Sequence, residues 1–302
     1  MPLDTITWDS GTTHCSLPVG SKFRYWMHSY GPDYLALILL IAAYLLIVFF
    51  VEPFHRMFYI NNLYLQYPHA HVERVSVTWN IFYAGLVPLV ILIIWLLAHK
   101  SSNHKSNVTI LGFLISIALT VFISDAIKNA VGRPRPDLIA RCKPALGTPE
   151  NTLVSYTVCT ETDHHTLHDG WRSFPSGHSS FAFSGLGYLA LFLAGQFHVF
   201  HPNVGLIKSV LAFAPLLSAA MIAISRCEDY RHDVYDVTCG TIIGICMAYF
   251  SYRRYFPNLR NSRCDEPYKP RISNSNEGFG KVKNDEEIAG PRRDFGGSNN
   301  DE

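Results

Sequence analysis

Residues 34–51 have the sequence YLALILLIAAYLLIVFFV, which contains no charged side chain. A helix needs roughly 20 consecutive apolar residues to cross the hydrocarbon core of a bilayer. Five further apolar stretches of similar length follow along the chain, at residues 77–98, 108–127, 180–197, 204–224 and 234–252. The sequence therefore predicts an all-α fold, that of a polytopic membrane protein with a bundle of six transmembrane helices.

The composition agrees with a membrane protein and excludes other classes. Hydrophobic residues make up 48% of the 302 residues and charged residues 16%, with a mean hydropathy of +0.11. An average soluble chain contains roughly 25% charged residues. Lys and Arg together number 25 and Asp and Glu 24, so the net charge of +1 provides no field that would attract nucleic acid.

The polar ends of the chain suggest three parts. We expect residues 1–33 to form a cytosolic N-terminal segment and residues 34–256 to form the membrane domain. Residues 257–302 are rich in Pro, Asn, Ser, Gly and charged residues, which favours a disordered cytosolic tail.

Three polar strings stand at the ends of the apolar stretches, and counting the spans places all three on the same membrane face. Their sequences are Lys128-NAVGRP-Arg135-Pro136, Phe174-Pro175-Ser176-Gly177-His178 and Ser225-Arg226-CEDYR-His232-DVY-Asp236. Ionisable groups at membrane depth cost about 2.5–3.5 kcal/mol each, so a cluster of them indicates a functional site.

The cations of these strings predict a binding site for a multiply charged anion. Lys128, Arg135 and Arg226 are expected to converge from three helices, and guanidinium groups suit phosphate in particular. Ser176 and Gly177 begin a helix whose free N–H groups favour an anion, and Gly177 lets the backbone approach it closely.

Two histidines add the groups for phosphoryl transfer. His232 and Asp236 are four residues apart, so on a helix they lie one turn apart on the same face. A carboxylate that holds one ring nitrogen as N–H makes the other nitrogen a competent nucleophile toward phosphorus. His178 is suited to protonate the leaving oxygen. The pattern predicts a phospho-histidine intermediate.

Lys-x6-Arg-Pro, Pro-Ser-Gly-His and Ser-Arg-x5-His-x3-Asp resemble the three motifs of the type 2 phosphatidic acid phosphatase superfamily, and all eleven fixed positions are present. The resemblance implies a metal-independent, cofactor-free phosphatase with a six-helix core of the PAP2/acid phosphatase–haloperoxidase type. It implies His232 as nucleophile, His178 as acid and Asp236 as the residue that orients His232. It also implies phosphate binding by Lys128, Arg135, Ser176, Gly177 and Arg226.

Longer stretches resemble the fungal diacylglycerol pyrophosphate phosphatases. They are PFHRMFYINNLYLQYPHAHVERV (53–75), RPDLIARC (135–142), DGWRSFPSGHSSFAFSGLGYL (169–189) and SRCEDYRHDVYDV (225–237). This resemblance implies hydrolysis of diacylglycerol pyrophosphate, phosphatidate and lysophosphatidate at a vacuolar or Golgi-type membrane. Sphingoid or polyprenyl phosphates remain alternative substrates, because the motifs contact only the phosphate.

Other functions fit parts of the pattern. A phosphotransferase would carry the same motifs, whereas non-enzymatic relatives lack catalytic residues that are present here. A transporter would place its charges near the midplane of broken helices rather than at helix ends. We expect no metal site at His164, His165 and His168, and we expect Glu228 and Asp229 on a solvated loop face. The sequence does not indicate an oligomeric state.

Basic residues suggest an orientation. Eleven lie on the face of the termini and ten on the other, of which seven remain when Lys128, Arg135 and Arg226 are discounted as functional. The positive-inside rule then places the termini in the cytosol and the site in a lumen. Cys142 and Cys159 lie in the long connection on the lumenal side, and the sequence leaves open whether they form a disulfide or stay free.

Overall fold

The computed structural model describes residues 19–270. Residues 30–268 form one compact unit. Residues 19–29 belong to a second unit and are helical. Helices account for all the regular elements of the described residues, which confirms the all-α prediction. The long helices are α1 (Val19–Phe50), α4 (Asn103–Val131), α7 (Gly177–Gln196), α8 (Leu206–Glu228) and α9 (Val234–Tyr255).

The second predicted span contains a π-helical turn in its first half. It consists of α2 (Val77–Ile81) and α3 (Val87–Ala98), joined without a break by a π-helical turn, Phe82–Leu86. Pro88 stands at the start of α3, where the missing N–H costs little because the wide turn before it already interrupts the regular ladder.

Five of the six predicted spans are confirmed as helices long and apolar enough to cross a membrane: Trp26–Phe50, Val77–Ala98, Asn103–Val131, Leu206–Glu228 and Val234–Tyr255. The first begins before residue 34, the start predicted from the sequence. The fourth predicted span forms helix α7 but is not among the five, so a six-span bundle is not confirmed.

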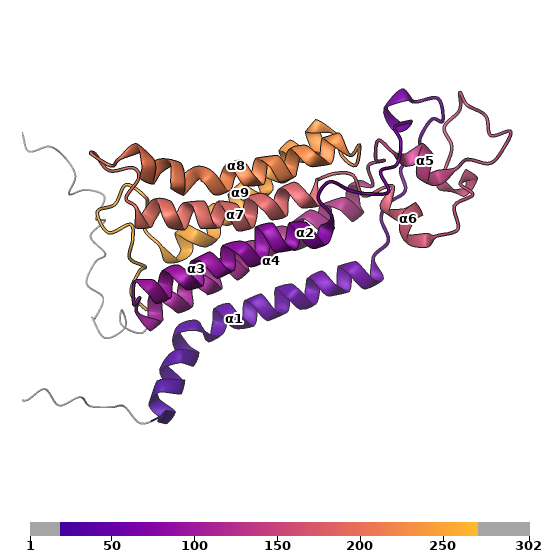
Figure 1. Ribbon diagram of the computed structural model, residues 1–302. Coiled ribbons are helices and arrows are strands. Elements are labelled where there is room, and N and C mark those ends of the chain that lie inside the picture. The colour runs from indigo at the N-terminus through magenta and orange to yellow at the C-terminus, as the bar shows by residue number, and fades with distance from the viewer. Residues whose placement is uncertain (1–18, 271–302) are drawn as a thin grey trace, which may run out of the picture. The chain divides into compact units, whose positions relative to one another are not determined.

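Helix α7 is largely surrounded by other parts of the protein. Most of its residues are buried, and it packs against α4, α8, α9 and the π-helical turn (Figure 1). At Gly185 an added Cβ would lie 1.8 Å from the carbonyl oxygen of Ala84, so only glycine permits this approach of the two backbones. Small residues at helix contacts are typical of membrane bundles.

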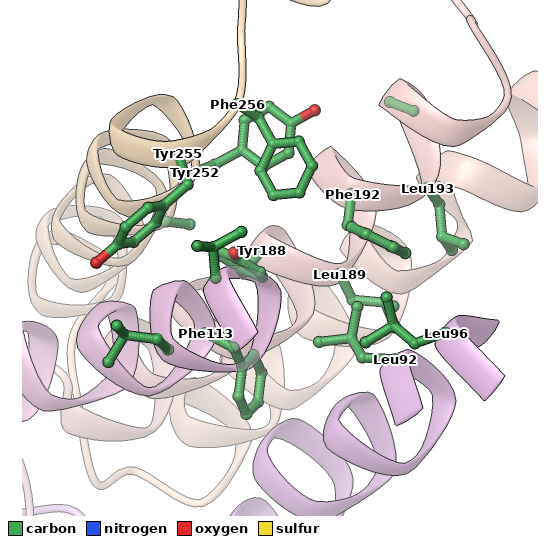
Figure 2. Packing of buried hydrophobic residues seen from close by; sticks show 14 of the residues in the cluster. Leu92, Leu96, Phe113, Tyr188, Leu189, Phe192, Leu193, Tyr252, Tyr255 and Phe256 are labelled. Carbon is green, nitrogen blue, oxygen red and sulfur yellow. The ribbon is translucent and has the colours of Figure 1, made fainter. Parts of the chain in front are cut away.

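The largest hydrophobic cluster joins α3, α4, α7 and α9 (Figure 2). Tyr252 stacks on Phe256 with 5.0 Å between ring centroids, and Tyr188 meets the edge of Tyr252 at 6.2 Å. Tyr188 is ten residues along α7 from His178, or about 15 Å at 1.5 Å per residue. This aromatic layer therefore stabilises the half of the bundle that lies away from the three motifs.

The connection between α4 and α7 is ordered and contains two short helices, α5 (Leu138–Cys142) and α6 (His164–Asp169). Cys142 and Cys159 form a disulfide, which answers the question that the sequence left open. The side chain of Trp171 is fully buried beside Phe58, and its Nε1 donates to the carbonyl of Arg56. The connection is thereby tied to the segment that follows α1.

Residues 257–268 differ from the prediction of a disordered tail. They form hydrogen-bonded turns, the side chain of Cys264 is fully buried, and Tyr268 N–H donates to the carbonyl of Tyr255 at 2.8 Å. The Sγ of Cys264 also lies 3.4 Å from the carbonyl oxygen of Gly195. This segment packs on the ends of α7 and α9, and the rest of the predicted tail, 271–302, lies outside the described residues.

Candidate active site

The three predicted motifs meet at one end of the bundle, where α4 and α8 end and α7 and α9 begin (Figure 1). The N–H of Ser176 donates to the carbonyl of Asp236 at 2.9 Å, and Lys128 lies 3.4 Å from an ideal Cβ on Gly177. Six of the predicted site residues are at most 8% exposed: Lys128, Arg135, Ser176, Arg226, His232 and Asp236.

His178, in the first turn of α7, faces the same cluster. Arg226, His232 and Lys128 all act electrostatically on its ring. Its Nε2 is buried and has no hydrogen-bond partner among the described residues. A buried polar atom without a partner is costly, so this nitrogen is suited to a ligand that brings its own acceptor or donor.

His232 does not lie on a helix, contrary to the sequence prediction. Helix α9 begins at Val234 with Asp233 as its N-cap, and Asp236 completes a capping box by accepting from the N–H of Asp233 at 3.1 Å. His232 precedes the cap. Its Nδ1 lies 3.8 Å from Oδ2 of Asp236, which is longer than a hydrogen bond.

Asp236 is instead held by two other side chains. Arg133 donates to its Oδ1 at 2.6 Å, and the hydroxyl of Ser173 donates to its Oδ2. The carboxylate is therefore fixed opposite Nδ1 of His232, and Nε2 is the ring nitrogen that faces away from it.

Burial lowers the pKa of His232 to about 3, and the positive charges of Arg135 and Lys128 act in the same direction against the opposing effect of Asp236. The imidazole is therefore neutral at pH 7. A neutral imidazole retains the lone pair that a nucleophile requires.

The predicted phosphate-binding arginines are paired with carboxylates. Arg135 donates to Oδ1 of Asp169 at 2.8 Å. Arg226 donates to Glu73 at 2.9 Å and to Asp229 at 2.7 Å. Burial opposes ionisation of Asp169, but the charge of Arg135 and of further nearby cations outweighs it and lowers the pKa of Asp169.

Lys128 differs from these arginines. Its Nζ donates to the carbonyl of Arg172 at 3.1 Å, and within the described part of the chain no carboxylate lies within 4.0 Å of it. Asp125 pairs with Arg172 rather than with Lys128. The lysine is thus the motif cation that a bound phosphate reaches without displacing a carboxylate.

The N-terminus of α7 completes the arrangement. The hydroxyl oxygen of Ser176 caps the helix by accepting from the N–H of Ser179 at 3.4 Å. The N–H groups of Gly177 and His178 belong to the first turn and have no acceptor within the helix. Together with the cations they suit an anion with several oxygens.

Comparison with known proteins places this geometry in a family. Residues 109–260 match the PAP2 superfamily model. The chain belongs to the PAP2 superfamily. It is 41% identical to diacylglycerol pyrophosphate phosphatase 1 of Saccharomyces cerevisiae, over 85% of this chain and 87% of that protein.

Two further relatives support the membership. The chain is 35% identical to probable diacylglycerol pyrophosphate phosphatase 1 of Schizosaccharomyces pombe, over 83% of this chain and 89% of that protein. It is 37% identical to lipid phosphate phosphatase 2 of Arabidopsis thaliana, over 78% of each chain. With its apolar helices, this PAP2 protein is an integral membrane protein.

Several residues of the candidate site were not predicted from the sequence. Arg133 and Ser173 hold Asp236, and Asp169 and Glu73 neutralise the arginines. Asp229, expected on a solvated loop face, is 5% exposed and pairs with Arg226. Charged residues next to the motifs were the available signal, because buried charges are seldom unpaired.

Proposed function

We propose that this protein is a lipid phosphate phosphatase that hydrolyses diacylglycerol pyrophosphate, phosphatidate and lysophosphatidate without a metal ion. The observation that carries the proposal is the buried, neutral His232 beside Asp236 and three motif cations. The names of the fungal and plant relatives support the class of substrate.

The reaction proceeds in two steps. Nε2 of His232 attacks phosphorus, the bond from phosphorus to the leaving oxygen breaks, and His178 supplies the proton that this oxygen takes. Water then attacks the phospho-histidine and gives a proton back to His178, which releases inorganic phosphate and restores His232. Asp236 stabilises the positive charge on the imidazole ring, and the cations and the α7 N-terminus stabilise the phosphoryl oxygens.

We expect the wild-type protein in detergent to release phosphate from all three lipids. For each lipid the rate in magnesium should equal the rate in EDTA. His232→Ala should abolish release while its expression and gel-filtration profile stay normal. Release that needs magnesium, or that persists in His232→Ala, contradicts the mechanism. Product analysis with an added acceptor alcohol separates hydrolysis from phosphoryl transfer.

The compartment and the orientation belong to the same proposal. An active site in the lumen of a vacuolar, Golgi or other endomembrane, with cytosolic termini, agrees with the disulfide between Cys142 and Cys159. Disulfides persist in oxidising compartments rather than in the cytosol. Protease protection of an epitope tag at each terminus in sealed vesicles tests the orientation, since protected termini would reverse it.

A further inference from the structure

A groove lies between α2–α3 and α8, with α7 as its floor. It has a volume of about 520 Å³. Tyr83 and Val87 form one wall, Met221 and Ile222 form the other, and Leu186 lies at the base. Ligand sites of this size that are mostly apolar typically hold a small molecule or part of one.

The position of the groove directs its open side toward lipid. Both walls belong to confirmed spans, Val77–Ala98 and Leu206–Glu228. Leu186 and Ile222 are 5% and 6% exposed, whereas Met221 at the rim is 60% exposed. A bilayer around these helices would therefore present its acyl chains to the groove.

One end of the groove touches the ion cluster of the candidate active site. Ser225 lines the groove, and its hydroxyl accepts from Nε of Arg226 at 3.2 Å. Arg74 also lines it, and the backbone N–H of Arg74 donates to Asp229, the carboxylate that pairs with Arg226. Arg74, Ser225 and Glu228 thus form a polar end of the groove, and Ser225 connects this end to the buried Arg226.

We propose that this groove binds an acyl chain of the lipid phosphate while the headgroup occupies the site of Arg226 and His232. This inference rests on the proposed function. Because lipid tails are as apolar as the groove, its effect is on placement rather than on affinity: the chain fixes the phosphorus relative to His232. The wide π-helical turn contributes by setting Tyr83 on the wall.

The test places a bulky side chain in the part of the groove that lies away from the proposed headgroup position. Ser218 lines the groove and is exposed, seven residues from Ser225, or about 10 Å along α8. Ser218→Trp blocks this part of the groove. Leu217→Trp is the matched control, because Leu217 is 68% exposed and does not line the groove.

The measurement is kcat/KM for dioleoyl and for dihexanoyl phosphatidate in mixed micelles, because a six-carbon chain fills much less of the groove than an oleoyl chain does. We expect the dioleoyl-to-dihexanoyl ratio to fall about tenfold or more in Ser218→Trp, since misplacement of the reacting group slows the reaction. The ratio should stay within about twofold of wild type in Leu217→Trp.

An unchanged ratio in Ser218→Trp, or an equal fall in Leu217→Trp, overturns the groove proposal. Met221→Trp serves as a second variant if Ser218→Trp does not give monodisperse protein. If the wild type releases phosphate from neither lipid, the proposed function fails instead. If it hydrolyses both and the ratios of all variants agree, only the groove proposal is wrong.

Discussion

Nη1 of Arg133 donates a hydrogen bond of 2.6 Å to Oδ1 of Asp236, so the segment that follows α4 holds the first turn of α9. The same guanidinium pairs with Asp233, the N-cap of that helix, at 2.9 Å. His232 precedes the cap directly. The position of the proposed nucleophile therefore depends on an arginine that does not itself contact it in the structure.

The first prediction concerns this arginine. We expect Arg133→Ala to lower kcat by up to about 100-fold, because Asp236 loses the partner that holds it opposite His232. KM should change little, since Arg133 acts as a positioning residue. Arg133→Lys should restore part of kcat by keeping one charged donor. A raised KM with unchanged kcat would show instead that Arg133 binds the substrate.

The second prediction is a pH dependence of stability. The pKa of His232 falls from 6.5 in the unfolded chain to about 3 in the folded protein, so protons bind preferentially to the unfolded state. The stabilisation is present above the unfolded pKa and is lost as the pH falls from 6.5 toward 3. The lowered pKa of Asp169 acts in the same direction at lower pH.

We therefore expect the thermal midpoint of the wild type to fall between pH 7 and pH 4, and to fall less in His232→Gln. His164→Gln is the control, because the side chain of His164 is 71% exposed and its removal should leave the pH dependence unchanged. Parallel curves for the wild type and His232→Gln would contradict the assignment.

The third prediction concerns Glu73, whose carboxylate pairs with two arginines of the candidate site. Its carboxylate pairs with Arg226 at 2.9 Å and with Arg231 at 2.8 Å. Glu73→Gln removes a competing anion, so inorganic phosphate should inhibit at a concentration about two- to fivefold lower. Glu228→Gln is the control, since Glu228 pairs only with Arg74 within the described residues. Weaker inhibition in Glu73→Gln would mean that the carboxylate organises the site rather than competing for it.

The fourth prediction uses the disulfide. Cys142 and Cys159 are 17 residues apart, and closing a loop of this size stabilises a fold by about 3 kcal/mol. Cys142→Ser should lower the thermal midpoint and make it insensitive to reductant. Cys246→Ser, at an exposed free cysteine, should do neither. A wild-type midpoint that dithiothreitol leaves unchanged would argue against the stabilising role.

The parts of the fold that the sequence predicts well are those with a local signal. The apolar runs of α1, α4, α8 and α9 follow from bilayer thickness alone. Helix α7 is the exception, since most of its residues are buried against other helices and it is not among the five confirmed spans. The turns around Cys264 were missed because their order comes from packing on α7 and α9, which composition does not reveal.

The candidate site likewise contains residues that the sequence predicts and residues that it does not. The spacing of the motifs predicts Lys128, Arg135, Ser176 and His232 as site residues. The span count supports this, because it places the helix ends that carry the motifs on one membrane side. Glu73 comes from a segment outside the motifs and Asp169 pairs with the arginine of another motif, so no spacing reveals these two pairs. Asp229 lies only three residues from its partner Arg226. The position of His232 before α9 was not predicted, because its four-residue spacing to Asp236 was interpreted as one turn of a helix.

The aromatic layer of Tyr188, Tyr252 and Phe256 involves α7 and α9, which also carry the proposed chemistry, but it lies in the middle of α7 and at the far end of α9. Substitutions in that layer change the rigidity of the bundle without altering the contacts of His232. Lineages that live at different temperatures, or in membranes of different fluidity, can therefore adjust this layer independently. We expect natural variation to accumulate in the aromatic layer while the opposite helix ends stay fixed.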